Sequence, residues 1–153
     1  MRDTNAPLPD TAFWRAYGGK FSGTLNWQQF DTLFDRLAAA GGEWFVFDPT
    51  GDAPDSPVPD LAESLAEARA CVEQVRSRSY CGAVFADSFE APGFVKVFDP
   101  YKMGGVCGGS GERVLPRWIF SRLAPDPLPL MPEAPVAKGV LARLVAQAGA
   151  GRS

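Results

Sequence analysis

A helix that runs almost directly into a strand, within residues 26–47, restricts the fold of this chain more than any other feature. Asn26 is suited to cap the first helical turn, and Gly41 and Gly42 end the helix because glycine readily adopts the left-handed conformation found there. The next residues, 43–47, are aromatic and β-branched and predict a short buried strand. The helix carries one apolar stripe at helical spacing, formed by Trp27, Phe30, Leu33, Phe34 and Leu37. Such a stripe has to be buried, and the adjoining strand belongs to the sheet against which it packs.

Helices and strands continue to alternate after this unit. Asp60 precedes a second amphipathic helix at about 61–77, and residues 79–86 and 94–98 predict two strands of an antiparallel hairpin. A short helix is expected near 117–123. The predicted order is α-β-α-β-β-α, with one further helix at the C-terminus. This order predicts a small α+β fold, in which helices cover one face of a three- or four-stranded, mainly antiparallel or mixed sheet.

The two ends of the chain differ from this central part. Residues 1–25 predict an irregular arm that lays aromatic side chains on the core. Five prolines between 125 and 135 predict a semi-rigid linker at 126–135, after a single α+β domain at 1–125. Within the linker, "PLMP" and "PEAP" fit the spacing of prolines in segments that bind other proteins as a polyproline II helix.

Residues 136–153 predict an amphipathic helix and a loose tail. The apolar stripe of this helix is a candidate contact for another protein or for a second copy of the chain, because amphipathic helices dock in apolar grooves. Packing of the helix on its own domain is the alternative. The candidate partner-binding residues are Val136, Val140, Leu141 and Leu144.

The absence of histidine excludes several classes of enzyme and metal site. Without it, the 153 residues cannot form a Ser-His-Asp triad, a Cys-His dyad or a histidine metal ligand. A net charge of −3, with scattered arginines, argues against nucleic-acid binding. The sequence shows no signal peptide and no apolar stretch of the ~20 residues that span a bilayer. Its three cysteines form no CxxC pair. We therefore expect a cytoplasmic protein that binds no nucleic acid, membrane, metal or cofactor.

The glycine-rich stretch "MGGVCGGSG" at 103–111 is a candidate site. It lacks the lysine of a phosphate-binding P-loop and meets a proline where a dinucleotide fingerprint requires a helix. Its successive amides are suited to hold an anion, with Arg113 nearby and Ser110 within the loop. A plain connection is the alternative. Cys107 is expected to be the most reactive of the three thiols, because Cys71 and Cys81 lie on a predicted helix and a predicted strand that pack in the core.

Two predicted strands end in the same dipeptide, Asp48-Pro49 and Asp99-Pro100. If these strands are parallel neighbours, both carboxylates lie at one end of the sheet, where they could hold a cation or divide acid and base roles. The alternative is that each Asp-Pro pair only ends its strand. Lys96 interrupts the apolar run "FVKVF" and predicts an edge strand. The candidate ligand-binding residues are Asp48, Asp99, Cys107, Ser110 and Arg113.

The function that these features favour is protein binding. No complete catalytic signature is present, which makes an enzyme the less favoured class, and the linker with its helix is typical of a small accessory or adaptor protein. The alternative is a protein that binds a small ligand or an anion, or a histidine-free enzyme, with its site between Asp99 and Arg113.

Overall fold

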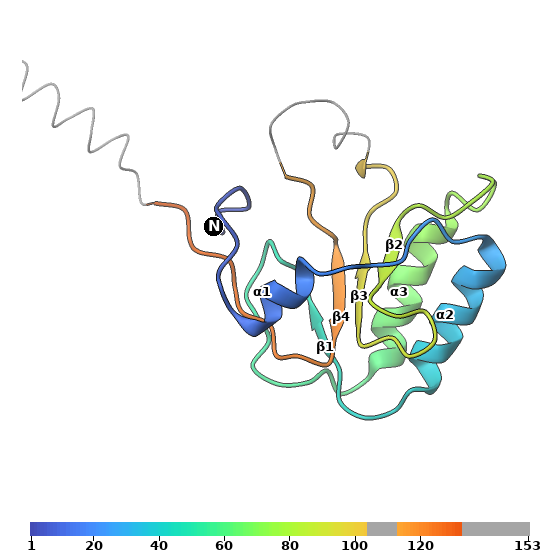
Figure 1. The fold of residues 1–153 in the computed structure, drawn as a ribbon, viewed down its shortest axis with the longest axis horizontal. Coiled ribbons are helices and arrows are strands. Elements are labelled where there is room, and N and C mark those ends of the chain that lie inside the picture. The colour runs from blue at the N-terminus through green and yellow to red at the C-terminus, as the bar shows by residue number, and fades with distance from the viewer. Residues whose placement is uncertain (104–112, 133–153) are drawn as a thin grey trace, which may run out of the picture.

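The computed structural model describes residues 1–103 and 113–132, which form three helices and one four-stranded sheet (Figure 1). The helices are α1 (Ala12–Tyr17), α2 (Trp27–Ala39) and α3 (Leu61–Glu73). The strands are β1 (Phe45–Phe47), β2 (Val84–Ala86), β3 (Phe94–Val97) and β4 (Trp118–Ser121). They lie in the order β1-β4-β3-β2, and every neighbouring pair is antiparallel. The α+β class is confirmed, whereas the predicted C-terminal helix at 136–153 lies outside the described residues.

The unit of helix and strand at residues 26–47 forms for the local reasons that the sequence predicts. The Asn26 side chain accepts a hydrogen bond from the Gln29 amide at 2.7 Å, and the Gln29 side chain accepts one from the Asn26 amide at 2.8 Å. This reciprocal capping satisfies two amides at the start of α2. Gly41 and Gly42 have φ of +65° and +73° and turn the chain toward β1. At Gly42 a Cβ would also come within 2.6 Å of the Arg122 guanidinium.

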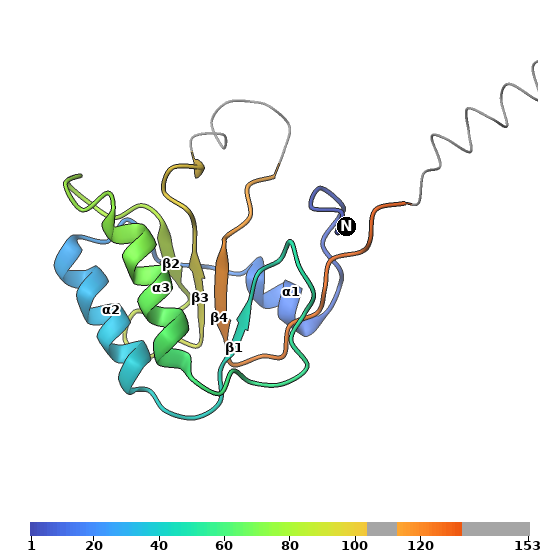
Figure 2. The ribbon, with the colours of Figure 1, turned by 180° about the vertical axis from the view of Figure 1, so that it is seen from behind.

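Both faces of the sheet are covered, so the expectation that helices lie on one face is wrong. Helices α2 and α3 pack on one face, over the larger apolar cluster, which includes Phe34, Val72 and Phe120. Helix α1 packs on the opposite face (Figures 1 and 2). The second cluster, on the α1 face, consists of Phe13, Trp14, Phe47, Phe94, Ile119 and Leu128. The predicted irregular arm therefore contains a helix, although its aromatic side chains do cover the core as expected.

Strand β4 occupies the position where a short helix was expected, near 117–123. It pairs with β1 on one side and with β3 on the other, so it lies inside the sheet. Ile119 faces the α1 cluster and Phe120 faces the opposite one, and both are fully buried. A strand buried on both faces shows a continuous apolar run without alternation. The observed order is therefore α-α-β-α-β-β-β, which corrects the predicted one.

The segment after β4 packs against the body as far as Met131. Leu128 is fully buried in the second cluster, and the Trp14 indole donates a hydrogen bond to the Asp126 carbonyl at 2.8 Å. The Met131 amide donates to the Met1 carbonyl at 2.7 Å. The first half of the predicted linker at 126–135 thus contributes to the core.

Lys96 lies on β3, which is hydrogen-bonded on both sides, so the prediction that it marks an edge strand is wrong. Its ammonium lies 4.0 Å from the ring centroid of Tyr17 and 3.9 Å from that of Phe21. Burial lowers the pKa of Lys96 to about 8. The two ring faces attract the ammonium and offset part of its lost hydration. Lys96 therefore holds residues 17–21 over the sheet.

This environment predicts a dependence of stability on pH. Between pH 8 and pH 10 the folded protein has released the Lys96 proton, whereas an unfolded lysine, with a pKa of about 10.4, still binds it. Stability is therefore expected to rise across this interval, by about 1–2 kcal/mol once partial exposure is allowed for. Above pH 10 it falls again, because burial raises the pKa of Tyr17 to about 12. Urea unfolding of Lys96→Met should show no rise, whereas the exposed control Lys20→Met should keep it. A rise that persists in Lys96→Met would contradict this assignment.

Candidate functional site

The two Asp-Pro pairs lie at the same end of the sheet. Strands β1 and β3 are both antiparallel to β4 and therefore run in the same direction, but β4 separates them, so they are not the neighbours that the prediction required. Asp48 and Asp99 nevertheless line one hollow of about 270 Å³. We call this the strand-end hollow. Its other lining residues are Thr50, Lys102, Val114, Leu115, Pro116 and Arg117.

Each of these aspartates has a structural task. The Asp48 side chain accepts hydrogen bonds from the amide and the hydroxyl of Thr50, at 2.9 and 2.7 Å. The Asp99 side chain accepts one from the Tyr101 amide at 2.9 Å. Such bonds are typical of aspartates that start turns after strands. Within residues 1–103 and 113–132, no group of three or more Cys, Asp and Glu side chains is placed to hold a metal ion.

The other sequence-predicted residues do not join this hollow. Arg113 is turned to the N-terminal segment, where its amide donates to the Asn5 side chain at 2.8 Å and its guanidinium donates to the Thr4 carbonyl at 3.2 Å. Cys107 and Ser110 lie outside the described residues. The same is true of the partner-binding candidates Val136, Val140, Leu141 and Leu144.

A second hollow, of about 540 Å³, separates α3 from the start of β4. Asp99 and Arg117 line it as well as the strand-end hollow, and Cys71 lies on its α3 side. Burial, and then the charge of Asp99, raise the pKa of the Cys71 thiol. The thiolate is the reactive form of cysteine, so this environment lowers the reactivity of Cys71.

Alkylation should therefore distinguish the three cysteines. Cys81 is fully buried and burial raises the pKa of its thiol, so we expect no labelling of Cys81 in the folded protein. Cys71 should react slowly, and Cys107 is predicted to react first. Iodoacetamide labelling at neutral pH, followed by peptide mass spectrometry, measures the order. Labelling of Cys81 ahead of the other two would contradict the buried position at the start of the β2–β3 hairpin.

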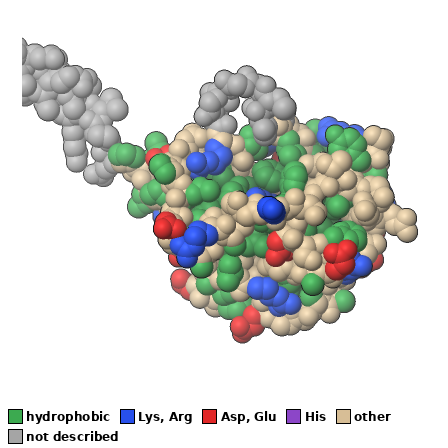
Figure 3. Space-filling model, viewed as in Figure 1, with side chains coloured by type: hydrophobic (Ala, Val, Ile, Leu, Met, Phe, Trp, Pro, Cys, Tyr) green, Lys and Arg blue, Asp and Glu red, His purple; other side chains and the backbone are tan. Residues whose placement is uncertain are grey.

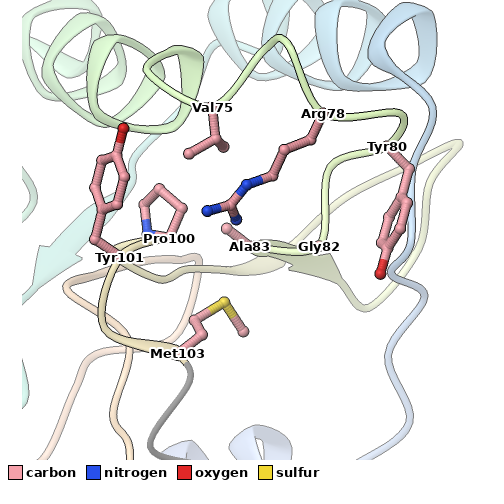
Figure 4. A pocket seen from close by; sticks show the side chains of 8 residues that line it. All are labelled: Val75, Arg78, Tyr80, Gly82, Ala83, Pro100, Tyr101 and Met103. Atoms are coloured by element: carbon pink, nitrogen blue, oxygen red, sulfur yellow. The ribbon is translucent and has the colours of Figure 1, made fainter.

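The third concave surface lies between the end of α3 and the turn after β3, and sequence reasoning missed it. We call it the Arg78 cleft; it has a volume of about 490 Å³. Figure 4 shows the Arg78 side chain reaching into its centre, with Tyr80 and Tyr101 at opposite ends. These two tyrosines are 52% and 63% exposed. The remaining lining residues are Val75, Gly82, Ala83, Pro100 and Met103.

Two segments that are remote in sequence, 75–83 and 100–103, form the walls of this cleft. After α3, the Arg78 amide donates to the Val75 carbonyl at 2.9 Å, and the Trp27 indole donates to the Arg78 carbonyl at 2.8 Å. The Asp99 turn fixes the backbone of Tyr101. The Tyr101 hydroxyl donates a hydrogen bond to the Gln74 carbonyl at 3.4 Å. The cleft therefore presents its side chains on backbone that is already ordered.

On the molecular face shown in Figure 3, basic and acidic side chains are interspersed among hydrophobic ones, without a large field of one sign. Within the described part of the chain, no helix is both long enough and apolar enough to cross a bilayer. Searches against protein-family models, curated proteins and solved structures found no match to this chain.

Proposed function

We propose that this chain is a small cytoplasmic accessory protein that acts by binding another protein through the Arg78 cleft. The observation that carries the proposal is the pair of exposed tyrosines, Tyr80 and Tyr101, on either side of a concave surface centred on an arginine. Tyrosine, arginine and methionine are enriched in the centres of protein interfaces. The cleft brings all three residue types together.

The composition of the floor supports a protein partner. Val75 and Ala83 are buried beneath the cleft, while its rim carries large side chains that a partner can cover. Tyrosine contributes a large contact area at a low cost in conformational entropy, because only two side-chain torsions have to be fixed. An adaptor needs a second surface, and the sequence-predicted stripe of Val136, Val140 and Leu141 would provide it.

A small anionic or zwitterionic ligand at the strand-end hollow is the second candidate. It is favoured by Lys102 and Arg117, which line that hollow beside Asp48 and Asp99. A ligand with one negative and one positive group would find partners for both there. The tasks of the two aspartates in turns give this candidate the weaker support.

Affinity capture with three forms of the full chain tests the proposal. Wild type and Arg117→Glu, which changes an exposed residue outside the Arg78 cleft, should retain the same protein. Arg78→Glu should lose it by at least about tenfold, because reversing a charge within an interface places like charges together. Equal capture by Arg78→Glu would contradict binding at the cleft. A loss confined to Arg117→Glu would instead support the strand-end hollow.

A further inference from the structure

The Arg78 cleft contains a guanidinium that lies 5.9 Å from the ring centroid of Tyr101 but has no carboxylate partner among the described residues. Among the described residues, Arg78 is the only charged one that lines it. The nearby Arg69 and Arg76 both bind Asp31, at 2.8 and 2.7 Å, but none of the ion pairs among residues 1–103 and 113–132 includes Arg78. A guanidinium pairs well with a carboxylate. The cleft is therefore suited to an occupant that carries one carboxylate beside apolar groups.

The walls of the cleft indicate the form of that occupant. Tyr80 and Tyr101 lie at its ends and Pro100 lies between them (Figure 4). Grooves lined by aromatic residues recognise proline-rich segments, since a polyproline II helix is extended beforehand and loses little entropy on docking. An extended segment that contains prolines, an apolar side chain and a carboxylate would match the cleft.

The chain itself contains such a segment, residues 129–133, with the sequence "PLMPE". Leu130 and Met131 are 63% and 48% exposed, although both are large and apolar. The backbone is already held out in an extended form, because the Pro129 carbonyl accepts a hydrogen bond from the Asp3 amide at 2.7 Å and Leu130 forms an antiparallel bridge with Arg2. In the sequence, Glu133 directly follows Pro132 and supplies the carboxylate.

This segment is remote from the cleft of its own molecule. Figures 1 and 2 place residue 132 beside the N-terminus, on the opposite side of the body from the chain between α3 and β2, which carries Arg78. Glu133, one residue further, adds less than about 4 Å of reach. We propose that the Arg78 cleft binds the segment Pro129–Glu133 of a second copy of this chain, a proposal that rests on the proposed role of the cleft in protein binding.

Contact between two different surfaces makes the assembly head-to-tail. Each copy then offers one cleft and one proline-rich segment, so the copies form a ring where the rotation closes and an open chain where it does not. The surface is small, which is typical of weak and transient association. The oligomer should therefore grow with protein concentration.

Sedimentation velocity on the full chain, from low to high micromolar concentration, tests the proposal. Wild type and the control Lys20→Glu, which changes an exposed residue that lines neither the Arg78 cleft nor the strand-end hollow, should show a sedimentation coefficient that rises with concentration. Arg78→Glu and Glu133→Arg should each weaken association by at least about tenfold, since each places like charges in the contact. An equimolar mixture of these two variants should associate again, because every contact then pairs a glutamate with an arginine.

Three results would overturn self-recognition: a wild type that stays monomeric throughout, association that Arg78→Glu leaves unchanged, or a mixture that fails to recover. Circular dichroism of both variants confirms that each is folded, and both substitutions fall on exposed or terminal segments. If wild type is monomeric while Arg78 is still required to capture a different protein, protein binding at the cleft stands and only the second copy as its occupant is rejected.

Discussion

Replacement of Leu128 by alanine in the full chain is expected to lower the free energy of unfolding by about 2–5 kcal/mol, the range for a large side chain removed from a packed core. Leu128 is fully buried on the α1 face of the sheet, together with Trp14, Phe47 and Ile119. Urea unfolding followed by tryptophan fluorescence measures the change. Leu130→Ala, two residues further along, is the matched control and should change stability by no more than about 0.5 kcal/mol, because Leu130 is 63% exposed.

The same reasoning applies to a chain cut after residue 125. Such a fragment loses Leu128 and also leaves the Trp14 indole without its acceptor, the Asp126 carbonyl. An unpaired buried donor costs a further ~1–3 kcal/mol. A midpoint equal to that of the full chain, for the fragment or for Leu128→Ala, would contradict a core that extends to this segment.

Ile119→Pro is expected to abolish cooperative unfolding. Ile119 lies at the centre of β4, opposite Phe47 of β1 and Lys96 of β3. Proline has no amide hydrogen to donate to the ladder and it also removes a fully buried side chain, which together cost at least ~5 kcal/mol, comparable to the whole stability of a small domain. Ile119→Val keeps the amide and most of the volume and should cost only about 0.5–1.5 kcal/mol. A cooperative transition for Ile119→Pro near that of wild type would contradict a central strand.

The elements that sequence reasoning predicted well depend on neighbouring residues. Helix α2 begins at a capping pair, Asn26 and Gln29, and is followed by Gly41 and Gly42, all within one short stretch. The β2–β3 hairpin is likewise local, and its antiparallel pairing is confirmed. In both cases the signal for the element and the residues that stabilise it lie close together in the chain.

The element that was predicted wrongly depends on distant residues. The "WIFS" run of β4 is a strand because β1 and β3 flank it in the sheet. Both of those strands end more than twenty residues before β4 begins. When only the sequence is considered, a short apolar run after a proline such as Pro116 is equally typical of a short helix. The second cluster, on the α1 face, was missed for a similar reason, since it joins Phe13, Phe94 and Leu128 from separate parts of the chain.

The candidate sites likewise differ in how far they depend on residues that are distant in the sequence. The position of Asp48 and Asp99 at one end of the sheet follows from the direction of their strands, which the sequence pattern indicated. The Arg78 cleft combines residues from the end of α3, the start of the hairpin and the turn after β3. No motif links these segments, so only their packing reveals that Tyr80 and Tyr101 lie at opposite ends of one cleft with an arginine at its centre.

Photo-crosslinking in living cells tests most directly where this protein binds its partner. A photoreactive phenylalanine at position 80 lies in the Arg78 cleft, and the same residue at position 50 lies in the strand-end hollow. Thr50 and Tyr80 are both exposed, so neither replacement disturbs the core. We expect a discrete crosslinked protein from position 80, lost when Arg78→Glu is added, and none from position 50. A crosslinked protein from position 50 alone, or one from position 80 that persists with Arg78→Glu, would contradict binding at the Arg78 cleft.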